Sequence, residues 1–143
     1  MNKPNAAHER PMKTLDPKAA GIVLLDDDPF MLKLLTHMLA QLGYTRVVAC
    51  DCGEKALQQI TGTDEVVDLI FLDINMPGMD GVEFIRRLVE CRYGGSVILV
   101  SGENSRILES VEKLIEAHQL IALGCLQKPV KPNDCLLYTS RCV

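Results

Sequence analysis

Residues that could take part in chemistry stand at or just beyond the ends of four short apolar runs. In chain order they are Asp26, Asp27, Asp28, Asp73, Ser101 and Lys128. Clustered carboxylates repel one another unless a cation lies between them, and hard oxygen ligands of this kind suit Mg²⁺. A carboxylate can also attack phosphorus, while a hydroxyl and an ammonium group can hold phosphoryl oxygens. This combination of residue types indicates Mg²⁺-dependent phosphoryl transfer.

Each of these residues has a structural explanation when it is taken alone. An acid before a proline, as at Asp28, is commonly a helix cap. Ser101 before a glycine fits a turn, and Lys128 before a proline fits a break at the surface. The functional interpretation is favoured because the residues arrive in order at successive strand ends.

Five apolar runs are predicted as strands, and apolar residues at helical spacing fill the intervals between them. The predicted strands are 22–25, 46–49, 67–72, 97–100 and 121–126, and the predicted helices cover 29–42, a segment from 53, 82–88 and 107–115. Asp28 is the expected N-cap of the first helix, and Gly43 its expected end. This alternation predicts an α/β fold, a doubly wound parallel sheet with helices on both faces. Ligands of such sheets bind beyond the carboxyl ends of the strands, where the residues above would meet.

The composition indicates one ordinary globular domain. Of the 143 residues, 48% are hydrophobic and 24% charged, and the net charge is −4. An acidic chain without a basic stripe argues against direct nucleic-acid binding by this domain. No apolar run suggests a signal peptide or a membrane span, and the six cysteines lack zinc-site spacing, so we predict a cytoplasmic protein with reduced thiols. Residues 1–19 hold three prolines and are predicted as a flexible segment before a domain at 20–143.

Four segments resemble the signature segments of response-regulator receiver domains of two-component signal transduction. They are Leu-Leu-Asp-Asp-Asp-Pro, Phe-Leu-Asp-Ile-Asn-Met-Pro-Gly-Met-Asp-Gly, Val-Ser-Gly and Gln-Lys-Pro. The resemblance runs from about Ile22 to Lys131 and is most specific around Asp73. It implies a CheY-like, flavodoxin-like sheet with five strands in the order 2-1-3-4-5, and a phosphoprotein that regulates a downstream effector or partner.

The resemblance also implies a role for each matching residue. Asp73 would accept the phosphoryl group from a sensor histidine kinase or a phosphotransfer protein, and Ser101 and Lys128 would contact the phosphoryl oxygens. Asp27 would bind Mg²⁺ directly together with Asp73, whereas Asp26 would act largely through a metal-bound water.

Three further residues have expected roles through the same resemblance. The backbone carbonyl of Asn75 would complete the protein ligands of Mg²⁺. Asn75 and Glu103 match the two positions that tune phosphoryl lifetime, and an amide and an acid there resemble fast-cycling members. The resemblance therefore predicts a short-lived aspartyl phosphate. Pro129 is expected to follow Lys128 across a cis peptide bond.

The sequence departs from the family in three places. Cys125 stands where the family usually carries the aromatic that swings inward, so that switch cannot operate as such; a small space-filling thiol is favoured over a redox role. The stretch between Ser101 and Lys128 is long, which predicts an extended fourth helix or a longer loop. The tail 136–143 is short and polar, which predicts a truncated last helix and favours a fragment of a longer regulator.

Residues 122–128 show a further resemblance, to receivers attached to cyclic-di-GMP phosphodiesterase effectors.

Two other functions are compatible with parts of the pattern. A Mg²⁺-dependent phosphohydrolase with an aspartyl nucleophile would use Asp26-x-Asp28, but it needs a second acid pair late in the chain, and only Asp134 follows Lys128. A receiver-shaped binding module that is never phosphorylated would typically have lost some of the acids, the hydroxyl or the lysine. We therefore expect a phosphoacceptor rather than an enzyme. The fourth helix, fifth strand and last helix are the face that would form a homodimer.

Overall fold

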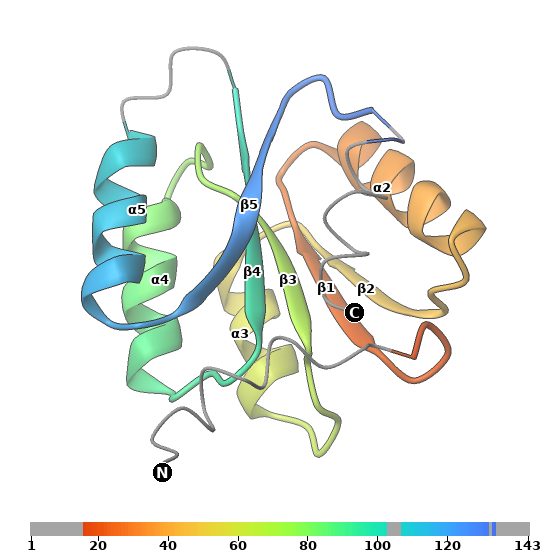
Figure 1. Cartoon of the computed structure of the whole chain (residues 1–143), viewed down its shortest axis with the longest axis horizontal. Coiled ribbons are helices and arrows are strands. Elements are labelled where there is room, and N and C mark those ends of the chain that lie inside the picture. The colour runs from red at the N-terminus through yellow and green to blue at the C-terminus, as the bar shows by residue number, and fades with distance from the viewer. Residues whose placement is uncertain (1–15, 103–106, 132, 134–143) are drawn as a thin grey trace, which may run out of the picture.

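Five strands form one sheet with helices packed against both of its faces (Figure 1). The computed structural model describes residues 16–102, 107–131 and 133. The strands are β1 (Gly21–Leu25), β2 (Arg46–Cys50), β3 (Leu69–Asp73), β4 (Ser96–Ser101) and β5 (Ile121–Gln127). The helices are α2 (Pro29–Gln41), α3 (Gly53–Thr61), α4 (Gly81–Glu90) and α5 (Ile107–Ala117). The predicted alternation of strands and helices is confirmed.

The strands lie in the order β2-β1-β3-β4-β5, and every neighbouring pair is parallel. The chain starts inside the sheet, moves outward to β2, and then crosses back past β1 to β3. This reversal creates a switch point at the carboxyl ends of β1 and β3, where open α/β sheets bind ligands. The predicted order 2-1-3-4-5 is confirmed.

Both faces of the sheet are covered, and this explains why its central strands are apolar throughout. Every residue of β1 and β3 is buried. One face packs on α2 through a cluster that contains Leu24, Leu35 and Phe71. The other face packs on α3, α4 and α5 through a cluster that contains Phe84 and Val111. A strand buried on both faces has no solvent side, so its sequence shows a continuous apolar run instead of an alternation.

Helix α2 begins where the sequence predicts. The Asp28 carboxylate accepts a hydrogen bond from the Phe30 N–H at 3.0 Å, and Pro29 is the first helical residue. A proline is favourable there because its missing N–H would have had no partner inside the helix. Beyond the helix, Gly43 has a φ of 98°, a conformation that glycine adopts without steric cost. Asp28 therefore has a structural role at the start of α2.

The third strand differs from its predicted bounds at both ends. The pattern predicts 67–72, whereas β3 spans Leu69–Asp73. Before the strand, the Asp68 carboxylate accepts the Gly21 N–H at 2.8 Å, so a side chain replaces the ladder carbonyl at this point. At the other end, Asp73 is paired with Val100 and is the last residue of the strand.

The long stretch between Ser101 and Lys128 contains an extra residue in β5. Val97 is paired with Ala122 and Ile98 with Gly124, so Leu123 is left over as a β-bulge. The described helix in this stretch, α5, has 11 residues, which is an ordinary helix length. Part of the extra length therefore lies in the strand.

Some predictions fall outside the described residues. They concern Glu103, the tail 136–143 with its truncated helix, and the first 15 residues of the segment 1–19. Residues 16–19 form a turn in which the Asp16 carbonyl accepts hydrogen bonds from the N–H groups of Ala19 and Ala20. The boundary of the domain at residue 20 remains a prediction. Among the described helices, none has the length and apolar character that crossing a membrane requires.

Candidate functional site

Four strand ends bring the predicted residues to one edge of the sheet. Asp26 follows β1, Asp73 ends β3, Ser101 ends β4 and Lys128 follows β5. The Asp26 N–H donates to the Cys50 carbonyl at 3.1 Å, and the Lys128 N–H donates to the Ser101 carbonyl at 2.9 Å. Hydrogen bonding between neighbouring strands thus continues one residue beyond the strands and fixes the backbone of the site.

Three of the predicted acids form a cluster at this edge. One carboxylate oxygen from each of Asp26, Asp27 and Asp73 lies within 4.8 Å of the other two. Asp26 and Asp73 are each 2% exposed, whereas Asp27 is exposed. Asp28 is outside the cluster because its carboxylate caps α2. The consecutive acids after β1 therefore divide into two site residues and one helix cap.

Lys128 brings a positive charge to the acid cluster. Its Nζ lies 3.2 Å from Asp26 Oδ2 and 3.4 Å from Asp73 Oδ2, but only the contact with Asp73 has hydrogen-bond geometry. Partial burial acts to lower the pKa of the Lys128 ammonium, yet the charges of Asp73 and Asp26 outweigh it and the net shift is upward. The lysine therefore carries its charge at neutral pH. The peptide bond between Lys128 and Pro129 is cis.

Asp26 has the features of a carboxylate that needs a cation. Burial is the main cause that raises the pKa of its carboxyl to about 6, the Asp28 N–H opposes this shift, and the charge of Asp73 adds to it. Oδ1 accepts the Asp28 N–H at 2.9 Å, whereas the buried Oδ2 has no hydrogen-bond partner among the described residues. A buried oxygen without a hydrogen-bond partner, beside two further carboxylates and faced by the Lys128 ammonium at 3.2 Å, fits a site for a hard divalent cation such as Mg²⁺.

The loop after β3 holds the Asp73 carboxylate from its other side. Asp73 Oδ1 accepts the Asn75 N–H at 3.0 Å. The Asn75 side chain in turn reaches β4, where its Oδ1 accepts the Gly102 N–H at 3.2 Å. Sequence reasoning did not predict this link, because the direction of a side chain in a loop leaves no periodic signal. Glu103, the second predicted lifetime residue, lies outside the described residues.

Ser101 and Cys125 lie against each other at the same edge. Ser101 is buried, and its Oγ lies 3.6 Å from Cys125 Sγ. The predicted phosphoryl-binding hydroxyl therefore touches the residue that stands in place of the family's aromatic. The sequence singled out both positions but did not predict their contact.

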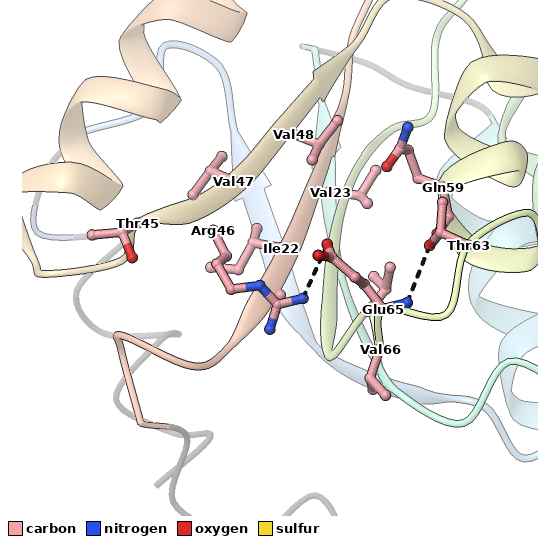
Figure 2. A pocket seen from close by; sticks show the side chains of 12 residues that line it. Ile22, Val23, Thr45, Arg46, Val47, Val48, Gln59, Thr63, Glu65 and Val66 are labelled. Atoms are coloured by element: carbon pink, nitrogen blue, oxygen red, sulfur yellow. Dashed lines mark hydrogen bonds and ion pairs between the residues drawn. The ribbon is translucent and has the colours of Figure 1, made fainter.

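A separate hollow of about 260 Å³ lies at the opposite edge of the sheet, near the starts of β1 and β2 (Figure 2). Val23, Val48 and Val66 line it beside the ion pair of Arg46 and Glu65, whose charged atoms are 3.4 Å apart. None of the predicted site residues lines this hollow. The residues that the sequence predicts for phosphoryl transfer therefore lie at the carboxyl ends of the strands and not at this hollow.

Curated proteins are about one third identical to this chain over the residues that align with it. The positive alginate biosynthesis regulatory protein of Pseudomonas aeruginosa is 33% identical over 116 residues, which cover 80% of this chain and 43% of that protein. Protein-glutamate methylesterase/protein-glutamine glutaminase 1 of Syntrophus aciditrophicus is 35% identical over 109 residues, covering 76% of this chain and 30% of that enzyme. The chain thus spans less than half the length of these relatives.

Solved structures agree with the fold over nearly their whole length. A response regulator from Colwellia psychrerythraea is similar with a TM-score of 0.71 and 29% identity, covering 85% of this chain and 94% of that one. The signal receiver domain of an HD domain-containing protein from Pseudomonas fluorescens has a TM-score of 0.69 and 26% identity, with coverages of 85% and 91%. The chemotaxis protein CheY4 of Vibrio cholerae has a TM-score of 0.72 and 25% identity, with coverages of 88% and 100%.

The sequence profile described as the response regulator receiver domain matches residues 22–139. This match begins at the second residue of β1 and covers the other four strands and the residues at the carboxyl ends of all five. Most of the chain is therefore covered by one profile, and the chain belongs to the family of response regulator receiver domains of two-component systems.

Proposed function

We propose that this receiver domain accepts a phosphoryl group on Asp73 in a Mg²⁺-dependent reaction and transmits the change to a downstream effector or partner. Receiver domains interact with histidine kinases or phosphotransfer proteins, and a phosphohistidine of such a protein is the proposed donor. The sensor histidine kinase GacS of Pseudomonas protegens is itself similar to this chain, with 36% identity over 101 residues that cover 68% of the chain and 11% of that kinase.

The position of the Asp73 carboxylate carries this proposal. Its Oδ2 lies 3.4 Å from Lys128 Nζ, and one of its oxygens lies within 4.8 Å of those of Asp26 and Asp27. A phosphoryl group on Asp73 would therefore have an ammonium on one side and metal-binding acids on the other. Phosphoryl transfer depends mainly on positioning and on fixed positive charge near the phosphoryl oxygens.

The proposed step forms one bond and breaks one bond. A carboxylate oxygen of Asp73 attacks phosphorus, and the P–N bond to the donor imidazole breaks with its electron pair remaining on nitrogen. The Lys128 ammonium compensates charge on the phosphoryl oxygens, and the Ser101 hydroxyl donates a hydrogen bond to one of them. Attack of water on the same phosphorus later breaks the P–O bond to Asp73, which releases inorganic phosphate and restores the Asp73 carboxylate. The domain thus acts only on its own phosphorylation and dephosphorylation.

Receiver domains bind Mg²⁺ at an acidic pocket, and the acid cluster of this chain fits that ion. We assign Asp27, Asp73 and the Asn75 carbonyl as direct ligands, with Asp26 acting through a bound water. When bound, Mg²⁺ neutralises negative charge on the phosphoryl oxygens. The chain's own contribution is to hold the carboxylates together. The hydrogen bond from the Asp26 N–H to the Cys50 carbonyl and the pairing of Asp73 with Val100 support this role.

The output of the domain is proposed only in outline, since the chain spans less than half the length of its relatives. The likeness of residues 122–128 to receivers attached to cyclic-di-GMP phosphodiesterase effectors remains a prediction. The cytoplasmic location and a homodimer through α5, β5 and the tail also remain predictions. The tail lies outside the described residues.

Intact mass after incubation with Mg²⁺ and acetyl phosphate tests the phosphoacceptor proposal. We expect wild type to gain the mass of one phosphoryl group and Asp73→Ala to gain none. Asp64→Ala is the matched control, because Asp64 is an exposed acid between α3 and β3, and it should keep the gain. Absence of a gain in wild type, or a gain that survives Asp73→Ala, would refute the proposal.

Two further variants, Asp26→Asn and Asp73→Asn, distinguish the phosphohydrolase alternative. That enzyme would turn over a small phosphomonoester, with activity lost in Asp26→Asn but retained in Asp73→Asn. We expect no such turnover from either variant or from wild type.

A further inference from the structure

The Ser101 hydroxyl has a sulfur partner beside the phosphoacceptor. Its Oγ lies 3.6 Å from Cys125 Sγ, which is within the range of a hydrogen bond to sulfur. Ser101 is 4% exposed, so bulk water has little access to the hydroxyl. Among the described residues, Cys125 is the one side chain that forms a hydrogen bond with it.

The Cys125 thiol has a second contact that defines how it can hold Ser101. Its Sγ lies 3.8 Å from the Leu126 carbonyl oxygen, toward which the S–H group can point. The sulfur is then available to accept the Ser101 O–H. A thiol is only a weak donor and a weak acceptor. The hydroxyl is therefore held in place, but by a partner from which it can be removed at small cost.

The β-bulge in β5 aims the thiol at Ser101. Because Leu123 is left over, Cys125 is paired with Leu99 instead of Val100. A one-residue shift moves every following side chain to the opposite face of a sheet, so without the bulge Cys125 would face α2. With the bulge, Cys125 lies in the apolar cluster of Leu99, on the face of β4 that also carries Ser101.

We propose that Cys125 is a positioning residue that holds the Ser101 hydroxyl in the unphosphorylated domain and releases it to the phosphoryl group. This inference rests on the proposed phosphorylation of Asp73. A hydrogen bond to an ionised phosphoryl oxygen is about twice as strong as one between neutral groups. A hydrogen bond to a thiol is weaker than both, because sulfur is a weak acceptor. The exchange is therefore favourable, and its strength is set by the residue at position 125.

The release also changes the surroundings of the apolar cluster on this face of the sheet. Cys125 packs against that cluster, to which Val111 of α5 also belongs. When Ser101 moves to the phosphoryl group, the thiol loses its partner on β4 while it stays against the cluster. The pair thus provides a physical link from Asp73 to the apolar core of this face that uses no aromatic side chain.

Binding of beryllofluoride, a phosphoryl mimic, to the full chain in Mg²⁺ tests the inference. We compare Cys125→Ser and Cys125→Ala, each in wild type and in a Ser101→Ala background, by ¹⁹F NMR titration. A hydroxyl at position 125 holds Ser101 more strongly, so Cys125→Ser should weaken binding by about fivefold, the equivalent of one ordinary hydrogen bond. Cys125→Ala removes the partner and should strengthen binding by about twofold. Both changes should disappear when Ser101 is replaced, because the double-mutant cycle isolates their interaction.

Two results overturn the inference. If each Cys125 substitution changes the affinity for beryllofluoride by the same factor with Ser101 present and with Ser101 replaced, position 125 acts through packing alone. If wild type neither binds beryllofluoride nor gains mass with acetyl phosphate, the proposed function fails and the inference fails with it. Binding with equal effects in both backgrounds leaves the phosphoacceptor proposal intact, so the two failures are distinguishable.

An infrared measurement keeps the test valid if a variant folds poorly. The S–H stretching band reports the hydrogen bonding of a thiol, and a difference spectrum of wild type with and without beryllofluoride shows only the thiols that change. We expect a shifted band in wild type, and its absence from either Cys125→Ala or Cys125→Ser, whichever folds as wild type does, assigns it to Cys125. A difference spectrum without an S–H band overturns the inference.

Discussion

Lys128 Nζ lies 3.4 Å from Asp73 Oδ2, although 55 positions separate the two residues in the chain. Strand β4 lies between their strands and fixes both, because Asp73 is paired with Val100 and the Lys128 N–H donates to the Ser101 carbonyl at 2.9 Å. The distance between the ammonium and the carboxylate is therefore set by the register of β3, β4 and β5. This contact places a positive charge where a phosphoryl group on Asp73 would carry negative charge.

Lys128→Gln should slow phosphorylation by acetyl phosphate about a hundredfold, the cost of losing one fixed charge at a developing anion. The rate is measured as the gain of intact mass with time. Lys113→Gln is the control, because Lys113 is 76% exposed on α5 and its ion pair with Glu109 is long and exposed. Equal rates in Lys128→Gln and the control would contradict the role of Lys128.

Asp26→Asn should stabilise the metal-free protein at pH 7.5. Burial raises the pKa of the Asp26 carboxyl from its ordinary value of 3.8 to about 6, so the folded state favours the protonated form. Because this pKa is raised, the contribution of Asp26 to the free energy of unfolding is highest below pH 3.8, where Asp26 is protonated in both states, and it falls as pH rises through about 6. The fall is at most about 3 kcal/mol, and Asp26→Asn abolishes it because asparagine does not ionise.

Denaturant unfolding in EDTA at pH 4.5 and pH 7.5 (roughly one and a half units either side of the folded pKa, where linkage predicts the contrast) measures this effect. The gain from Asp26→Asn should be small at the lower pH and larger at the higher one. A gain of the same size at both values would show that ionisation of Asp26 is not its source.

Mg²⁺ should stabilise wild type in denaturant unfolding without EDTA, because an ion that binds only the folded state shifts the equilibrium toward it. Asp27→Asn should reduce this stabilisation, since it removes a proposed direct ligand. Asp28→Asn is a useful comparison, because asparagine is also a good N-cap and Asp28 lies outside the acid cluster. Equal responses of the two variants to Mg²⁺ would contradict the assignment of Asp27.

Gly81→Ala should destabilise the domain by about 1–3 kcal/mol, the usual cost of adding a methyl group to a packed site. A Cβ at Gly81 would lie 2.8 Å from the Ile74 Cβ and 3.0 Å from its Cα, in the loop that leads from Asp73. Gly102→Ala is the control, because an added Cβ there meets no atom of the described residues within 4 Å. Similar unfolding midpoints for the two variants would contradict this prediction.

The aspartyl phosphate should be short-lived, as the residue types at Asn75 and Glu103 predict. Its decay after removal of acetyl phosphate is followed by intact mass, and a half-life of hours would contradict the prediction. Asn75→Ala should slow the decay, because it removes the amide that links the loop after β3 to the Gly102 N–H. An unchanged decay rate would show that Asn75 does not help to position the attacking water.

The sequence alone was sufficient for the order of elements and for the edge of the sheet that carries the site. Strands buried on both faces must be apolar throughout, so β1, β3 and β4 stand out as runs, and the polar residues that end them stand out as well. Asp28 was also predictable as a cap, because capping depends on neighbours in the chain.

The tertiary structure decided the contacts that depend on register between distant segments. Asp26 is buried at the end of β1, which lies between β2 and β3, and its Oδ2 has no hydrogen-bond partner among the described residues. Lys128 meets Asp73 across β4, and the bulge at Leu123 turns Cys125 toward Ser101. A hydrophobic pattern records which residues are buried, but not which strand they face or where an extra residue is absorbed. Those choices are made when the whole sheet packs.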